Sequence, residues 1–228
     1  MRKTIFLLNV DNFAPELTRI TYPFIRVYAK RIGATIHMIT ERKFPDWPVT
    51  YEKLQIYELG KQIGGWLMYI DSDALLHPEF LDITAHIPQD TVSCYSRDVA
   101  DIRWQTDDYF RRDGRHIGWG NWFSVASEQC LDLWHPLDIP KEEALENIFP
   151  TPNELACGVT REHLIDDYTL SRNVARYGLK FRTFKDIWKE QGLDNPLVQH
   201  QYTLSVKEQI RSHMELILKW KLEHLLGA

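Results

Sequence analysis

The chain has 228 residues, which is enough for one domain of ordinary size with an appended helix. Hydrophobic residues make up 44% of it, enough for a packed core and too many for a disordered chain. The 27 basic and 32 acidic residues give a net charge of -5 and are interspersed along the sequence, so we expect no nucleic acid partner.

Three cysteines, Cys94, Cys130 and Cys157, lie far apart and form no CxxC pair. This spacing is typical of reduced thiols, and we therefore expect a cytoplasmic protein, soluble or peripheral to a membrane. The apolar run at residues 4–10 is too short for a signal peptide and is followed by the charge of Asp11, so it predicts a first β-strand. No stretch approaches the about 18 apolar residues of a transmembrane helix, and the sequence leaves the oligomeric state open.

Apolar strands alternate with amphipathic helices along the chain, which predicts an α/β fold. We expect strands at residues 4–10, 34–40, 66–70, 92–95, 122–126 and 180–184, and helices at residues 23–32, 51–63, from 127, 167–177 and from about 204. Pro23 favours a helix start, and Gly33 and Gly178 favour helix ends. Ser205 is the expected cap of the C-terminal helix. The stripe of this helix expected to face inward comprises Val206, Ile210, Met214, Ile217 and Leu225.

Two carboxylates, Asp71 and Asp73, follow directly after the apolar strand at residues 66–70. In open α/β sheets, ligands bind beyond the carboxyl ends of the strands, and alternate residues at a strand end can project toward one ligand. Two ionised carboxylates that close repel each other unless a divalent cation neutralises them. Oxygen ligands of this kind suit Mg²⁺ or Mn²⁺, which can also bind a diphosphate. The pair therefore predicts a metal site at the end of this strand.

The residues around this pair resemble those of the GT-A glycosyltransferases, whose DxD motif follows a strand of the same kind. The resemblance is carried by YEKL at residues 51–54, WLMYIDSDALL at 66–76, NWFSV at 121–125 and CLDLW at 130–134. These segments are most similar to the α-galactosyl- and α-xylosyltransferase branch, and the similarity runs through residues 4–205, with the DxD segment its sharpest part.

The resemblance implies one GT-A domain over residues 1–228, with a Rossmann-like, mixed and mostly parallel sheet flanked by helices. Its parts would be a nucleotide-binding half at residues 1–95, an acceptor and catalytic half at 96–203 and a C-terminal helix at 204–228. The implied reaction moves a sugar from a nucleotide-diphosphate sugar, foremost a UDP-sugar, to a hydroxyl of a glycan, a glycoconjugate or a lipid-linked acceptor. Mn²⁺ or Mg²⁺ would be the cofactor.

The same resemblance implies roles for individual residues. Asp73 would bind the metal, and Asp71 would reach the metal or the ribose of the donor. His200 lies where many GT-A enzymes place a C-terminal metal ligand, and a neutral imidazole suits Mn²⁺, although a single histidine can also be an ordinary core or surface residue. The expected donor-binding residues are Asn9, Asp11, Lys53, Asp71, Ser72 and Asp73. The expected acceptor-binding residues are Trp104, Gly120, Asn121, Trp122 and Asp166.

For Lys53 the sequence leaves two interpretations open, a contact with the donor phosphates or a place on the surface of its helix. Asp166 and Asp167 are equally ambiguous, because an acid commonly caps a helix. The acidic pair also resembles the motif at the start of the catalytic GT-A helix, where the last carboxylate of inverting enzymes is the general base. Tyr168 stands where the galactosyl/xylosyl branch has Gln. The sequence therefore favours inversion, with Asp167 as base and Asp166 in reserve.

Two alternatives remain beside this assignment. A retaining transferase of the same fold would use Asp167 to orient the acceptor, while an oxygen of the leaving phosphate takes the proton. A non-catalytic sugar-binding module would explain the 8 Trp and 10 Tyr residues, because aromatic rings stack on sugars. It would not explain why a buried strand delivers two carboxylates to one point.

Overall fold

The computed structural model describes residues 1–12, 14–95, 122–150, 152–193, 197–201 and 203–226. Its main sheet has six strands in the order β2-β1-β3-β6-β5-β7, and a second sheet pairs β4 with β8. The strands are β1 Lys3–Leu8, β2 Thr35–Ile39, β3 Trp66–Ile70, β4 Leu75–Leu76, β5 Thr91–Cys94, β6 Phe123–Ser127, β7 Lys180–Thr183 and β8 Val198–Gln199. The α-helices are α1 Pro15–Ile32, α2 Ile56–Ile63, α4 Lys141–Glu146, α5 Pro152–Ala156, α6 Ile165–Arg176, α7 Phe184–Glu190 and α8 Val206–Trp220.

The main sheet is mixed and mostly parallel. Strand β1 lies between β2 and β3 and runs parallel to both, with Ile5 opposite Ile36 on one side and Met68 on the other. Strand β6 is antiparallel to β3 and β5, and β7 runs parallel to β5. The six expected strands are all present, and the predicted fold class is confirmed.

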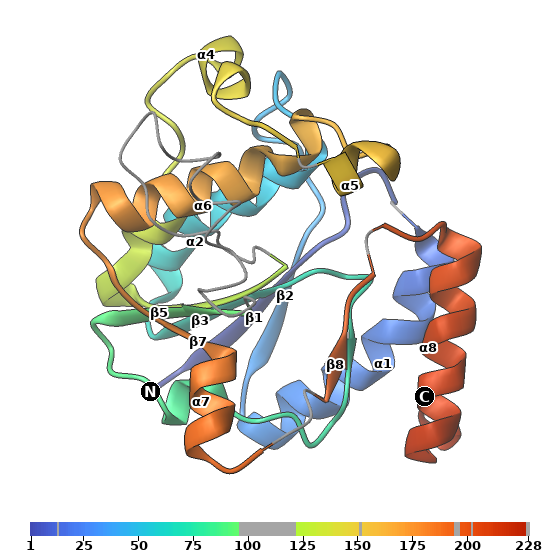
Figure 1. Cartoon of the computed structure of the whole chain (residues 1–228). Helices are drawn as coiled ribbons and strands as arrows, with labels where there is room; N and C mark the ends of the chain where they lie inside the picture. Colours follow the sequence, from blue (N-terminus) through green and yellow to red (C-terminus); the bar gives the residue numbers. More distant parts are fainter. Residues whose placement is uncertain (13, 96–121, 151, 194–196, 202, 227–228) are drawn as a thin grey trace.

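Helices cover both faces of the sheet (Figure 1). Alternate side chains of a strand point to opposite faces. Phe6 and Leu67 therefore belong to a core that includes residues of α2 and α6, whereas Ile5 and Met68 belong to a core with residues of α1 and α7. All five residues of β3 are buried, as the continuous apolar run predicted. The strand that ends at the two carboxylates is thus the centre of the fold.

Helix α1 begins earlier than the sequence predicted. Pro15 stands in its first turn, where a missing N–H costs nothing, and Pro23 lies inside the helix rather than at its start. The residues before Pro23 stay helical because Leu17 and Thr21 are buried along with the later turns. Gly33 ends the helix in a left-handed conformation, as expected, with φ 70°. Residues 51–63 also differ from a single helix, because Val49–Gln55 forms a 3₁₀ segment before α2.

Helix α8 packs against α1 and β4 through a small core of Phe24, Leu75 and Ile217. Ser205 caps it in a reciprocal hydrogen-bonded box with Glu208, which confirms the predicted cap. The predicted inward stripe is partly wrong. Val206 is 40% exposed. Met214 and Leu225 are partly buried and pack against this core as predicted, although Leu225 lies in a separate 3₁₀ turn beyond the end of the helix at Trp220. The fully or nearly buried residues of α8 are Gln209, His213 and Ile217.

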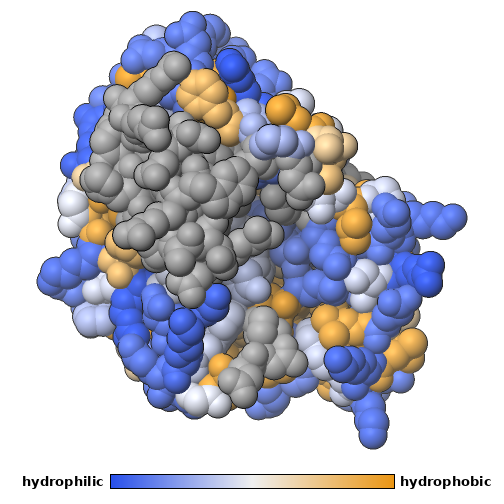
Figure 2. Space-filling view, in the orientation of Figure 1, coloured by the Kyte–Doolittle hydropathy of each residue, from blue (hydrophilic) through white to orange (hydrophobic). Residues whose placement is uncertain are grey.

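On the face shown in Figure 2, the described residues are mostly hydrophilic, with smaller hydrophobic areas between them. Within the described part of the chain, no helix combines the length and the apolar composition needed to cross a bilayer. None of the three cysteines forms a disulfide, as expected, and Cys94 and Cys130 are buried whereas Cys157 is exposed.

Candidate metal centre

Strand β3 ends at a tightly held loop, Asp71-Ser72-Asp73. The backbone N–H of Asp71 donates to the carbonyl of Trp122 at 2.8 Å, which ties the loop to the start of β6. The N–H of Ala74 donates back to the carbonyl of Asp71 at 3.0 Å and closes a turn. The buried hydroxyl of Thr21, on α1, donates to the carbonyl of Ser72. The two carboxylates therefore project from a backbone that its neighbours fix in place.

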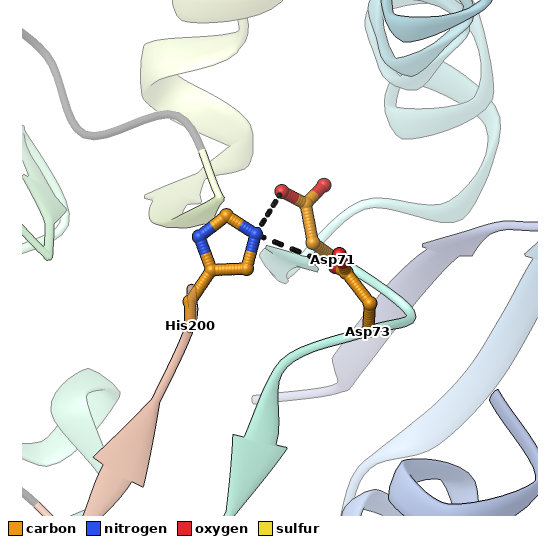
Figure 3. Close-up of side chains that lie close together, drawn as sticks. All are labelled: Asp71, Asp73 and His200. Atoms are coloured by element: carbon orange, nitrogen blue, oxygen red, sulfur yellow. Dashed lines mark ion pairs between the residues drawn. The ribbon is translucent and has the colours of Figure 1, made fainter. Parts of the chain in front are cut away.

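The short strand β4 follows this loop and brings His200 to it. β4 pairs antiparallel with β8, with Leu75 opposite Gln199, so that His200 comes next to the carboxylates directly after β8. The Nε2 atom of His200 lies 3.5 Å from Asp71 Oδ2 and 3.4 Å from Asp73 Oδ1, and the ring faces both side chains (Figure 3). The Trp122 ring stacks on the imidazole with centroids 5.1 Å apart.

One ligand atom from each of Asp71, Asp73 and His200 lies within 4.8 Å of the others. Two carboxylate oxygens and an imidazole nitrogen are ligands that Mn²⁺ and related divalent cations accept. The structure thus brings together the three residues that were predicted as metal ligands from distant parts of the sequence, and they form a group that could hold such an ion.

The three side chains set one another's protonation. Burial raises the pKa of the Asp71 carboxyl, against the charges of Lys53 and His200, which lower it. For Asp73, burial also acts to raise the pKa, but the hydrogen bond and charge of His200 outweigh it and hold the pKa below its usual value. For His200, burial acts to lower the pKa, yet the hydrogen bond to Asp73 and the charges of both carboxylates raise it. A cation bound here would therefore compete with the proton of His200.

Lys53 joins these carboxylates to the acidic pair of α6. Its side chain is buried and forms an ion pair with the buried Asp166, and its Nζ lies 3.7 Å from Asp71 Oδ1. The same Nζ lies 4.5 Å from the centre of the Tyr69 ring, whose hydroxyl donates to Asp71 Oδ1 at 2.5 Å. Burial acts to lower the pKa of Lys53, but the charges of Asp166 and Asp71 outweigh it and raise the pKa. Lys53 is thus a buried cation, not a residue on the surface of its helix.

Tyr69 was missed by sequence reasoning. It lies in the apolar run of β3, where a tyrosine is expected to serve as core. Its position two residues before Asp71 was the only available signal, because residues two apart on a strand share a face.

The residue that caps α6 is Leu164, so neither Asp166 nor Asp167 is the N-cap that one interpretation expected. Both acids lie in the first turn, where the helix dipole favours negative charge. Asp166 is 1% exposed, whereas Asp167 is only partly buried. Of the two, Asp167 is therefore the one with access to solvent.

The remaining predicted residues lie at the same end of the sheet or outside the described residues. Asn9 and Asp11 follow β1, the parallel neighbour of β3. The Asn9 Oδ1 atom is buried and has no hydrogen-bond partner among the described residues, and the exposed Asp11 lies 3.6 Å from Arg42. Ser72, which lies between Asp71 and Asp73 in the sequence, is buried. Trp104, Gly120 and Asn121, and the loop around them, are not among the described residues.

No family model matches the chain, and no curated protein matches its sequence. Among solved structures, the chain is similar to a glycosyltransferase involved in the glycosylation of the major capsid of PBCV-1, with a TM-score of 0.57 and 12% identity over 94% of this chain and 100% of that one. For the galactosyltransferase LgtC, in complex with donor and acceptor sugar analogs, the TM-score is 0.47, with 12% identity over 93% and 95% of the two chains. For apo mouse xyloside xylosyltransferase 1 it is 0.48, with 8% identity over 88% and 98%. The first of these likenesses shows the fold, and the chain therefore has the GT-A glycosyltransferase fold.

Proposed function

We propose that this protein is a metal-dependent glycosyltransferase that moves a sugar from a nucleotide-diphosphate sugar, foremost a UDP-sugar, to a hydroxyl of a glycan, a glycoconjugate or a lipid-linked acceptor. One observation carries the proposal. Asp71, Asp73 and His200 converge at the carboxyl end of β3 in a GT-A fold, and one carboxylate oxygen of each acid and one ring nitrogen of the histidine lie within 4.8 Å of one another. In open α/β sheets this edge is where ligands bind.

The donor set fits a divalent cation of the Mn²⁺ or Mg²⁺ kind, with Asp71, Asp73 and His200 as its protein ligands. Such an ion, when bound, would neutralise charge on the diphosphate of the donor and of the departing nucleotide. The loop hydrogen bonds described above keep both carboxylates oriented without a cost of reorganisation. Lys53 balances the charge of Asp71 and Asp166 from within the core, and its burial favours this supporting role over a direct contact with the donor.

Asn9 and Asp11 would contribute to the donor site from the end of β1. The buried Oδ1 of Asn9 can accept a hydrogen bond, and an N–H or O–H group of the nucleotide sugar could supply it, because buried polar atoms are nearly always paired. Within this scheme, residues 1–95 form the nucleotide-binding half, and residues 96–203 supply the acceptor half.

The acceptor hydroxyl must lose a proton as it attacks the anomeric carbon. Asp167 is our candidate for the base in an inverting reaction, because it is partly exposed while Asp166 is buried against Lys53. In the retaining alternative, Asp167 would instead orient the acceptor. An ¹H NMR spectrum of the first product decides between them, since it reports the anomeric configuration before and after transfer.

The test of the function is the release of nucleoside diphosphate from a panel of nucleotide sugars, with and without Mn²⁺. We expect release that depends on the metal and is lost in Asp73→Asn, which keeps the size of the side chain but removes its charge. Asp138→Asn is the matched control, because Asp138 pairs with Arg172 and Arg176 away from the cluster and its substitution should leave release unchanged.

Unchanged turnover in Asp73→Asn would contradict the proposed metal site. A non-catalytic module would give a different result, because it would bind free glycan and release no nucleotide. The donor can be found in the same samples by thermal shift, since a ligand that binds only the folded state raises the melting temperature.

A further inference from the structure

The three consecutive carbonyls of the loop Asp71-Ser72-Asp73 each accept a hydrogen bond, two of them from elsewhere in the protein. The carbonyl of Asp71 accepts from the N–H of Ala74, within the loop, and that of Ser72 accepts from the hydroxyl of Thr21 on α1. The carbonyl of Asp73 lies 2.9 Å from Nε2 of His213, a fully buried residue of α8. The C-terminal helix thus supplies one of the hydrogen bonds that fix this loop.

His213 also contacts the strand that carries the third member of the cluster. Its Nδ1 lies 3.2 Å from Oε1 of the side-chain amide of Gln199, the residue of β8 directly before His200. That amide in turn lies 3.1 Å from the hydroxyl of Ser212, the neighbour of His213 on α8. One imidazole therefore bridges the loop that carries Asp73 and the strand that leads to His200.

The tautomer of His213 follows from this geometry. A backbone carbonyl can only accept a hydrogen bond, so Nε2 carries the proton and donates to Asp73. In the neutral ring Nδ1 is then an acceptor, so it pairs with Gln199 when the amide turns its NH₂ group to Nδ1 and its oxygen to the Ser212 hydroxyl, which can donate. The donor to the loop is consequently a defined nitrogen, and a substitution can preserve it or remove it.

We propose that His213 is a positioning residue of the metal centre, which fixes Asp73 and His200 relative to each other through the Asp73 carbonyl and the Gln199 amide. This inference rests on the proposed metal-dependent function. It adds the C-terminal helix to the site, although α8 supplies no ligand of its own. Partners that orient ligands in this way are worth about 10- to 100-fold in metal affinity when they are removed.

A competing explanation is that His213 serves only to pack α8 on the domain. Its neighbour one turn later, Ile217, packs in the apolar contact of α8 with Phe24 and Leu75 and makes no polar contact with the loop. Loss of packing at either residue should lower the melting temperature. Only loss of the His213 hydrogen bonds should also weaken metal binding, so the two roles separate in one pair of measurements.

The experiment is a titration of the full-length chain with Mn²⁺ alone, with the free ion followed by electron paramagnetic resonance, together with thermal denaturation of each variant. We expect His213→Ala to raise the Kd for Mn²⁺ about 10- to 100-fold. His213→Gln should restore most of the affinity, because the glutamine amide nitrogen lies near the position of Nε2. His213→Asn should not, because its amide lies near the position of Nδ1. The control Ile217→Val should lower the melting temperature and leave the Kd unchanged.

The possible failures are distinct. A wild-type chain that binds no Mn²⁺ would overturn the metal centre itself, and the role of His213 with it. A wild-type chain that binds Mn²⁺ while His213→Ala binds it equally well would overturn only the role of His213. Rescue by asparagine but not by glutamine would also overturn it, because the bond to Asp73 would then not be the one that matters.

Discussion

Removal of the buried cation Lys53 should be the most destabilising single change at the site. The side chains of Lys53 and Asp166 are 2% and 1% exposed, and Lys53 also lies 3.7 Å from Asp71. Loss of one partner of a buried pair leaves the other charge uncompensated in the core, at about 3–5 kcal/mol. A chain of this size loses about 2–4 °C of melting temperature per kcal/mol. We therefore expect Lys53→Met, which keeps the length of the side chain, to melt about 6–20 °C below wild type.

Circular dichroism during thermal denaturation measures this effect, and the chain contains a matched control. Lys61 is an exposed lysine that pairs with Glu58 at 2.8 Å, and Lys61→Met should leave the melting temperature close to wild type, because exposed pairs contribute little. The double variant Lys53→Met, Asp166→Asn should recover part of the loss, since it removes the stranded charge. If Lys53→Met melts no lower than Lys61→Met, the interpretation of Lys53 as a compensating buried charge is refuted.

Three further predictions follow from the same structure. The carboxylate neighbours of His200 raise its pKa in the metal-free form, and metal binding needs the neutral ring. The Kd for Mn²⁺ should therefore rise, by up to about tenfold per pH unit, as the pH falls below that pKa. Mn²⁺ titrations from pH 5 to 9 check this, and a flat profile would contradict it. Of the three cysteines only Cys157 is exposed, so a thiol reagent should label one site in the native protein and three after unfolding. Thr183→Ala removes a reciprocal cap with Asp186 at the start of α7 and should lower stability by about 1 kcal/mol, seen as a fall of about 2–4 °C in melting temperature, whereas an unchanged value would show that the cap is dispensable.

The sequence was informative about the strand that delivers the carboxylates. Five consecutive apolar residues end abruptly at Asp71, and a run of that length, bounded by Gly65 and by two acids, predicts a buried strand. The edge of the sheet where it ends then follows from general rules of α/β folds. For these reasons the two carboxylates that follow β3, and their location in the fold, are predictable from the amino-acid sequence alone.

The elements that complete the site were harder to predict. Strands β4 and β8 are two residues long each, which is too short for any period of apolar residues to show. The closeness of His200 to Asp73 therefore rested on resemblance alone. Helix α7 was missed as well, although Thr183 with Asp186 three residues later is the pattern of a helix cap.

Helix α8 shows why apolar periodicity misjudged a buried face. Apolar periodicity assumes that buried positions are apolar, yet Gln209 and His213 are buried on this helix. The Gln209 amide nitrogen donates to the Leu204 carbonyl, and His213 forms a hydrogen bond with the Asp73 carbonyl. Polar residues of this kind carry no hydrophobic signal. One of the two positions that periodicity missed, His213, is where the helix contacts the loop Asp71-Ser72-Asp73.

Charge balance explains why these residues depend on one another. The carboxylates of Asp71, Asp73 and Asp166 all form ion pairs with Lys53 or His200. With His200 neutral, three carboxylates and one ammonium leave a net charge of two negative units, the charge that one divalent cation neutralises. Protonation of His200 reduces this negative charge by one unit, and its hydrogen bond to Asp73, together with the charges of Asp73 and Asp71, raises its pKa. Under the proposed function, a proton on His200 and a divalent metal would be alternative ways to compensate the same buried negative charge of Asp71 and Asp73.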